Sequence, residues 1–422
     1  MQNTTKYQAV ASHEAKKGEF KKAVLLYSGG LDTSVMLKWI QDEYQAEIIA
    51  LTIDIGQNED FGPIKEKALK LGAVSAHVID AKEEFANNYL SKAIKANADY
   101  QGGYHLFCPL GRAIISKVGV DIAHQENAQV IAHGCTGKGN DQVRFEGYIT
   151  TLDPQLKTIA PVREWGMGRE EELEYAAKHG IPVTQTAAKI YSYDENLWGD
   201  SAEGGEIESM SKIPPLDNIL INCKTPKNAP DQSEILEIEF EEGLPTAVNG
   251  EKMVLWKLIK MLAQIGAKHA VGITHLVEDR VVGLKVRGIF EEPAAEILIQ
   301  AHKNLEKLVC TRDENEFKTA IDQKWAYLCY GAKWFHPLMN HLNAYIDSVN
   351  KKVCGTVTVE LYKGKVSVVA VKSKYSLFNE NLATFMKNSS FNQNSSAGFI
   401  ELWNLPQKTA YNLTKDIYNQ NT

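Results

Sequence analysis

The sequence is poor in cysteine, and its six cysteines are spread along 422 residues without a Cys-x-x-Cys pair. A zinc site or a disulfide framework needs closely spaced or matched cysteines, so neither is expected. The pattern is typical of reduced thiols in a cytoplasmic enzyme. The six are Cys108, Cys135, Cys223, Cys310, Cys329 and Cys354.

Also lacking are a long apolar run and a dense basic stretch. Residues 1–20 are polar and no run approaches membrane-spanning length, so we expect neither a secretory signal nor a membrane span. The formal net charge is −7 without a lysine- and arginine-rich stripe, so nucleic acid is not the expected partner. These absences favour a cytoplasmic protein that acts on small molecules.

The first half of the chain alternates apolar runs of strand length with amphipathic helical runs. This order predicts an α/β fold, a doubly wound parallel sheet in which ligands bind beyond the carboxyl ends of the strands. Strands are expected at 23–27, 47–53, 76–79 and 129–133, and helices at 33–43, 63–71, 82–98 and 110–125.

The pattern changes near residue 185, and the remainder predicts an α+β second domain with a helical tail. Because the chain exceeds one typical core, we expect a flexible extension (1–20), two domains (21–185 and 186–382) and an arm (383–422). Within the second domain and the arm we expect a loop at 191–212, a hairpin of strands at 235–240 and 246–248, strand-like runs at 279–289 and at 356–371, the latter turning at Lys363-Gly364, and helices at 254–267, 294–311, 314–348, 399–403 and 410–418.

The most informative segment is Tyr27-Ser28-Gly29-Gly30-Leu31-Asp32-Thr33-Ser34, directly after the first strand. Its glycines let backbone N–H groups approach a ligand, and Asp32 is expected to cap a helix whose N-terminus adds positive dipole. Such a turn suits a phosphate or pyrophosphate. The lysine of a Walker A loop is absent, and the segment instead resembles the loop of the N-type ATP pyrophosphatases.

A second loop reads His133-Gly134-Cys135-Thr136-Gly137-Lys138-Gly139-Asn140-Asp141-Gln142-Val143-Arg144-Phe145-Glu146. Asn140 and Asp141 are expected to open a helix, and Arg144 follows Asn140 by four residues, on the same face. An arginine can clamp a carboxylate and an aspartate can hold an ammonium. Since an amino acid carries both groups, this loop predicts an amino-acid site.

The order of these motifs resembles that of the argininosuccinate synthetases, from about residue 23 to about residue 405. The resemblance implies a ligase that joins citrulline to aspartate with ATP and Mg²⁺, releasing AMP and pyrophosphate in arginine biosynthesis. It also implies a nucleotide-binding domain at 21–185, a synthetase domain at 186–382, and a homotetramer in which the arm serves oligomerisation. Further shared segments are Asp54-Ile55-Gly56-Gln57, Tyr191-Ser192, Glu195-Asn196-Leu197-Trp198-Gly199, Glu203-Gly204-Gly205, Glu278-Asp279-Arg280 and Lys285-Val286-Arg287-Gly288.

The resemblance assigns residues to each substrate. For ATP it implies Tyr27, Ser28, Gly29, Gly30, Leu31, Asp32, Thr33, Ser34, Gln57 and Gly134. For aspartate it implies Thr136, Asn140 and Asp141. For citrulline it implies Tyr104, Asn140, Arg144, Ser192, Ser201 and Glu278, with Cys108 and Phe290 on the same side, where the family usually has threonine and tyrosine.

The implied reaction needs no side-chain nucleophile, because ATP adenylates the ureido oxygen before the aspartate amine displaces AMP. Positioning and charge stabilisation would carry catalysis, with Asp32, Asp141 and Arg144 as candidate catalytic residues. Phosphate oxygens and water would hold most of the Mg²⁺ shell, with at most one carboxylate, Asp32 or Asp141. We therefore predict no metal site built from protein ligands.

The departures from the family pattern leave two alternatives open. Cys108, Phe290 and Pro293-Ala294-Ala295, where the family has Pro-Gly-Gly, all fall on the citrulline side. One alternative is a paralog that adenylates a different ureido, guanidino or amide substrate. The other is a binding protein that has kept the fold and lost most catalysis, which the two intact loops disfavour because such a protein need not keep both.

Overall fold

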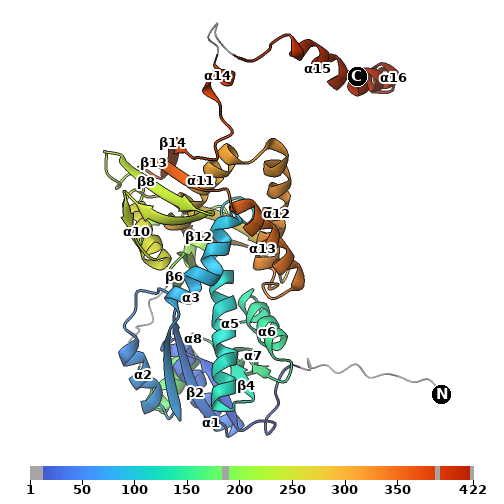
Figure 1. The fold of residues 1–422 in the computed structure, drawn as a ribbon. Helices are drawn as coiled ribbons and strands as arrows, with labels where there is room; N and C mark the ends of the chain where they lie inside the picture. Colours follow the sequence, from blue (N-terminus) through green and yellow to red (C-terminus); the bar gives the residue numbers. More distant parts are fainter. Residues whose placement is uncertain (1–12, 183–189, 385–389, 419–422) are drawn as a thin grey trace, which may run out of the picture. The chain divides into compact units, whose positions relative to one another are not determined.

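A computed structural model describes residues 13–182, 190–384 and 390–418 (Figure 1). The chain divides into two compact units, Met1–Tyr375 and Ser376–Thr422. The boundary expected between residues 185 and 186 lies outside the described residues. Among the described helices, none combines the length and the apolar character that a membrane crossing requires.

A five-stranded parallel sheet organises the first part of the larger unit. Its strands are β1 (Lys22–Leu26), β2 (Glu47–Asp54), β3 (Ser75–Asp80), β4 (Val130–Ala132) and β5 (Lys157–Ile159), in the order β3-β2-β1-β4-β5. The connecting helices are α1 (Leu31–Tyr44), α2 (Phe61–Lys70), α3 (Lys82–Phe85), a π-turn (Ala86–Leu90), α4 (Ser91–Lys95), α5 (Phe107–Glu126), α6 (Asp141–Leu152), α7 (Pro161–Glu164) and α8 (Arg169–Lys178).

Alternate residues of the central strands face opposite cores. Val24 and Ile49 belong to the core that contains α5, whereas Leu25 and Ile48 belong to the core that contains Met36 of α1. Because strand side chains alternate in direction, a strand buried on both faces needs apolar residues at consecutive positions, as β1 has after Lys22. This arrangement confirms the predicted doubly wound sheet.

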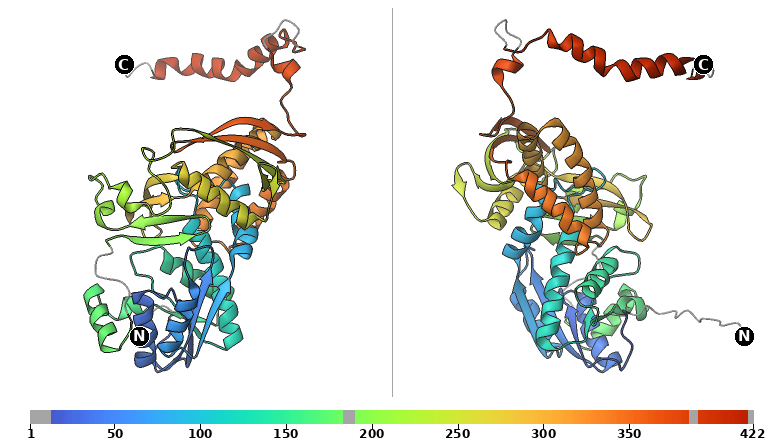
Figure 2. Two further views of the ribbon diagram at one scale, coloured as in Figure 1. Left: turned by 90° about the vertical axis from the view of Figure 1, so that its left-hand side faces the viewer. Right: turned by 45° about the vertical axis from the view of Figure 1, so that its right-hand side comes forward.

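Two antiparallel sheets follow in the same unit (Figure 2). One has the order β10-β9-β8-β13-β14 and the other β11-β12-β7-β6. Their strands are β6 (Ser192–Asn196), β7 (Gly199–Glu203), β8 (Glu234–Glu241), β9 (Leu244–Val248), β10 (Glu251–Lys252), β11 (Ile273–Asp279), β12 (Lys285–Glu291), β13 (Gly355–Tyr362) and β14 (Lys365–Lys372). Their helices are α9 (Leu216–Ile219), α10 (Leu255–Lys268), α11 (Pro293–Val309), α12 (Arg312–Tyr330) and α13 (Pro337–Asn350), with a 3₁₀ turn at Gly205–Glu208.

Three expectations for this second part were wrong in detail. The predicted loop at 191–212 contains β6 and β7, whose polar sequences lack the β-branched residues that are typical of strands. The predicted strand at 279–289 is the hairpin of β11 and β12. The predicted helix at 314–348 is broken between α12 and α13, because Pro337 can begin a helix but not continue one.

Residues 13–20 also differ from the flexible extension that was expected. Ala15 and Phe20 are buried against the parallel-sheet part, and Glu14 forms a parallel bridge to Thr158 of β5. The apolar side chains explain the docking, because they bury surface that a solvated tail would leave in water. Residues 1–12 lie outside the described part of the chain.

The smaller unit contains α14 (Glu380–Ala383), α15 (Ser395–Trp403) and α16 (Leu405–Tyr418). The last two correspond to the amphipathic segments expected at 399–403 and 410–418. Large apolar side chains on both are exposed in this single chain, namely Phe399, Ile400, Leu402, Trp403, Leu405, Tyr411, Leu413 and Ile417.

Candidate active site

The loop from Tyr27 to Ser34 joins the carboxyl end of β1 to α1. The Tyr27 hydroxyl and Ser34 Oγ are 3.0 Å apart, and Ser34 Oγ donates to the carbonyl of Gly30 at 2.6 Å. Gly29 has a φ of +77°, and a Cβ there would lie 2.9 Å from Ile64, so this turn requires glycine. These side-chain hydrogen bonds hold the loop in one conformation. The first N–H groups of α1 have no intrahelical acceptors, as at any helix start.

Asp32 does not cap this helix, contrary to expectation. The helix begins at Leu31, two residues before the expected start at residue 33, so the extended Gly30 is the N-cap. The Asp32 side chain is 56% exposed and pairs with Arg169 of α8 at 3.0 Å. It also lies beside Glu172, whose pKa burial and the Asp32 charge raise to about 8. Asp32 is therefore a solvent-facing carboxylate in the first turn.

Two further groups lie at the ends of β1 and β2. Gln57 accepts from the N–H of Ile55 at 2.7 Å and donates to the carbonyl of Ile53 at 3.0 Å, so its amide shapes the turn after β2. Lys67 of α2 donates to the carbonyl of Gly29 at 2.9 Å. That lysine adds a cation to the predicted phosphate loop, and sequence reasoning missed it.

A cavity of about 330 Å³ is lined by the loop at 133–141 and by parts of α5, α6, β6, β7, β11 and β12. Its wall includes all ten residues predicted to bind substrate, which are Tyr104, Cys108, Thr136, Asn140, Asp141, Arg144, Ser192, Ser201, Glu278 and Phe290. Of the residues predicted for ATP, Gly134 also lines it. A Cβ on Gly134 would lie 2.4 Å from Met36 Cε of α1, so the second loop passes close to the helix that follows the first.

Asp141 lies between two arginines. Arg112 Nε donates to its Oδ2 at 3.0 Å, and Arg144 Nη1 donates to its Oδ1 at 2.9 Å. Burial opposes ionisation, but the two guanidinium groups outweigh it and hold the pKa of Asp141 well below its usual range. Arg112 pairs on its other side with Asp194 of β6. These charges form one partly buried network of alternating sign.

Tyr330 connects the second loop to β11. Its hydroxyl donates to Glu278 Oε2 at 2.8 Å and accepts from Asn140 Nδ2 at 2.8 Å. Asn140 Oδ1 in turn accepts from the N–H of Val281 at 2.8 Å. Burial raises the pKa of Glu278 against the opposing effect of these hydrogen bonds and of nearby arginines. The network therefore fixes the position of a carboxylate on the cavity wall.

Of the residues that depart from the expected family pattern, Phe290 and Cys108 lie on the same wall, whereas Pro293, Ala294 and Ala295 are not among the residues that line it. Phe290 is 4% exposed and stacks on Tyr104 with ring centroids 4.6 Å apart. Cys108 Sγ lies 3.4 Å from Asp141 Oδ1, and burial raises the pKa of this thiol well above its usual value. A neutral thiol thus donates to the carboxylate.

Sequence reasoning missed several charged and aromatic residues of the wall and its support. Arg112 could have been found, because it follows Cys108 by four residues and so shares its helix face. Arg280 belongs to the shared segment Glu278-Asp279-Arg280, and its guanidinium forms two contacts to the Glu203 carboxylate at 2.7 and 2.8 Å. Tyr330, which comes from α12, has no local signal in the sequence.

The comparisons with known proteins all indicate one family, and together they cover nearly the whole chain. The family model described as the arginosuccinate synthase N-terminal HUP domain matches residues 22–182, and that of the C-terminal domain matches residues 191–410. The argininosuccinate synthase of Pyrococcus furiosus is 48% identical over 398 residues, which are 94% of this chain and 96% of that protein. Those of Dehalococcoides mccartyi and Rubrobacter xylanophilus are each 48% identical over 388 residues, or 92% of this chain and 95% and 94% of theirs. The chain belongs to the argininosuccinate synthase family.

Proposed function

We propose that the protein condenses L-citrulline with L-aspartate to argininosuccinate in arginine biosynthesis, converting ATP to AMP and pyrophosphate. The observation that carries this proposal is one cavity whose wall sets arginines among carboxylates. Two zwitterionic amino acids need both signs of charge close together. The family membership supports the same reaction.

The first step joins the ureido oxygen of citrulline to the α-phosphorus of ATP, and pyrophosphate leaves. The loop from Tyr27 to Ser34 and the N-terminus of α1 supply N–H donors for the departing phosphates. Lys67 adds a positive charge beside Gly29. Charge stabilisation of the leaving group by preorganised donors is the main contribution of these residues.

In the second step the aspartate amine attacks the activated ureido carbon, loses a proton, and AMP leaves with the former ureido oxygen. Thr136, Asn140 and Asp141 are assigned to aspartate. Tyr104, Arg144, Ser192, Ser201 and Glu278 are assigned to citrulline. Their task is to bring amine and carbon together, and such positioning alone can contribute several kcal/mol, about 7–11 in the best intramolecular cases.

Mg²⁺ is the expected companion of ATP. Asp141 is a poor ligand for it, since Arg112 and Arg144 already share its carboxylate. Asp32 fits better, because its carboxylate is exposed in the first turn of α1. The ion would neutralise charge on pyrophosphate when bound, with phosphate oxygens and water filling its shell.

The helices α15 and α16 support the proposal of a homotetramer, in which their apolar side chains would pack on neighbouring copies. The six free thiols support a cytoplasmic location.

The test is to quantify AMP and pyrophosphate with ATP and aspartate, with and without citrulline. AMP and pyrophosphate that form in equal amounts, and only when citrulline is present, would support the proposal. Product formation that requires another ureido or amide compound instead would favour a paralog, and no AMP with any acceptor would favour a binding protein.

A further inference from the structure

The segment at residues 13–20 precedes the match to the family model, which begins at residue 22. It nevertheless pairs with the edge of the parallel sheet. The N–H of Ala15 donates to the carbonyl of Thr158 at 3.0 Å, and the N–H of Thr158 donates to the carbonyl of His13 at 2.9 Å. This pairing fixes the directions in which the side chains of His13 and Glu14 project.

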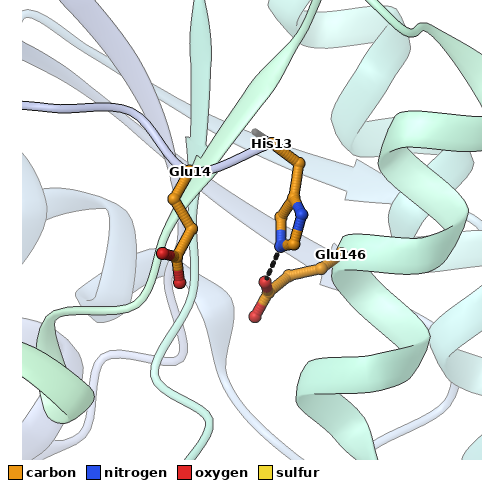
Figure 3. A group of neighbouring side chains, drawn as sticks. All are labelled: His13, Glu14 and Glu146. Carbon is orange, nitrogen blue, oxygen red and sulfur yellow. Dashed lines mark hydrogen bonds and ion pairs between the residues drawn. The ribbon is translucent and has the colours of Figure 1, made fainter. Parts of the chain in front are cut away.

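His13 begins a chain of contacts to the start of the second loop. Its Nε2 donates to Glu146 Oε2 of α6 at 2.6 Å (Figure 3). The other oxygen of Glu146 accepts from Nε2 of His133 at 3.2 Å. His133 Nδ1 accepts from the N–H of Cys135 at 3.3 Å. Because one ring nitrogen accepts and the other donates, Glu146 sets both the tautomer and the orientation of His133.

Glu14 begins a second chain of contacts, to the end of the same loop. Its carboxylate accepts from Arg163 Nη2 of α7 at 2.8 Å. Arg163 Nη1 donates to Gln142 Oε1 at 2.8 Å, and Gln142 Nε2 donates to the carbonyl of Gly139 at 3.3 Å. The stretch held in this way runs from Cys135 to Gly139. Within it, Cys135, Thr136 and Gly139 line the substrate cavity.

We propose that residues 13–14 are a clamp for the second loop, in which His13 holds its start through Glu146 and Glu14 holds its end through Arg163. His13 and Glu14 are positioning residues, since neither lines the cavity. The loop carries the residues assigned to aspartate, so the clamp preorganises aspartate binding, an inference that rests on the proposed function. Preorganisation lowers the cost of ordering a binding loop.

A metal ion is the competing explanation, because His13, Glu14 and Glu146 offer ligand atoms within 4.8 Å of one another. Arg163 argues against it. Its Nη1 lies 2.6 Å from Glu146 and its Nη2 lies 2.8 Å from Glu14, so one guanidinium group already pairs with both carboxylates. A divalent ion there would meet that positive charge at close range.

The test compares the variants His13→Ala and Glu14→Gln with Glu19→Gln, all made in the full-length protein. Glu19 is the matched control, because it belongs to the same segment and pairs with Lys157 at 2.8 Å without reaching the loop. The KM for aspartate should rise about three- to tenfold in the two clamp variants, the effect of one lost hydrogen bond. The KM for ATP should stay within about twofold in all three, because the loop at 27–34 is not in this chain of contacts. His13→Lys, which supplies another N–H donor to Glu146, should recover much of the loss.

Hydrogen exchange of the amides at 134–140 gives a readout that does not depend on catalysis. Exchange should accelerate in the clamp variants and remain as in the wild type in Glu19→Gln. Unchanged exchange and unchanged aspartate KM in both clamp variants would overturn the proposal, as would Zn²⁺ binding by the wild type that His13→Ala abolishes. A wild type without citrulline-dependent AMP would instead overturn the proposed function, and the exchange result would still decide whether the clamp exists.

Discussion

Arg112 Nε donates to the carboxylate of Asp141 at 3.0 Å, and this contact joins α5 to the first residue of α6 across the substrate cavity. The same carboxylate also accepts from Arg144, so its charge is shared before any substrate binds. Asp141 therefore orders two guanidinium groups on the cavity wall in addition to any contact with aspartate. A substitution there should disturb amino-acid binding more than ATP binding.

Asp141→Asn tests this relationship. The KM for aspartate should rise tenfold or more, since a charged hydrogen bond contributes about 1.5–3 kcal/mol, while the KM for ATP should change little. Asp194→Asn is the control, because Asp194 pairs with Arg112 from the other side and should have a smaller effect. Equal losses in the KM values for aspartate and ATP would instead mark Asp141 as a phosphate- or metal-site residue.

Phe290→Tyr tests which acceptor the cavity takes. The ring is stacked on Tyr104, and its tip approaches Gly288, where a Cβ would lie 2.9 Å from Phe290 Cζ. If citrulline is the substrate, the new hydroxyl should leave its KM similar or up to about tenfold lower, the effect of one hydrogen bond. A paralog with an apolar contact at this position should lose activity, because a buried hydroxyl without a partner is costly.

Asp32→Ala tests whether the Asp32 carboxylate contributes to catalysis or only to the stability of the fold. Because Asp32 is no cap and its pair with Arg169 is largely exposed, the free energy of unfolding should fall by no more than about 1 kcal/mol. Pyrophosphate release should nevertheless drop sharply if the carboxylate serves ATP or Mg²⁺. Asp42→Ala, on the same helix but far along it, is the control. Near-normal pyrophosphate release from Asp32→Ala would place the ATP site elsewhere.

Glu146 should make the protein sensitive to acid. Burial opposes its ionisation, but His133 and Arg163 lower its pKa to about 2 from an ordinary 4.5. A lowered folded-state pKa stabilises the fold fully above about pH 4.5, and this contribution, on the order of 3 kcal/mol, is lost as the pH falls toward 2. Urea unfolding of Glu146→Gln at pH 7, 4 and 3 should therefore show a shallower loss of stability than the wild type. Parallel curves for the two proteins would contradict this assignment.

The sequence predicted those parts of the fold whose signals are local. The strand β1 is apolar at consecutive positions, and the turn at Gly29 needs a positive φ, so both were recognisable. The strand β7 was missed because its polar residues become buried only when β12 pairs with it. The strand β6 was missed because it lies at the edge of its sheet, where its polar residues stay mostly half-exposed. Local pattern cannot show burial that comes from distant segments.

At the candidate site, too, residues with a local signal were predicted and residues without one were missed. Residues grouped in two loops were easy to choose, and the structure brings the predicted substrate residues to one cavity. Tyr330 was missed because it reaches the second loop from an element 190 residues away along the chain. Arg163 was missed because it stands on a separate short helix, and nothing in the sequence indicates its contact with Gln142. The predicted cap, Asp32, was misplaced by two residues from the observed cap, Gly30, a difference that only the backbone angles of Gly30 decide.

The most direct test of the central claim is to follow the ureido oxygen of citrulline. With [ureido-¹⁸O]citrulline, aspartate and ATP, mass spectrometry should find one ¹⁸O in the phosphate of AMP and none in pyrophosphate. That result follows from adenylation of the ureido oxygen and its departure with AMP. AMP without the label, or AMP formed at the same rate when citrulline is omitted, would contradict the account.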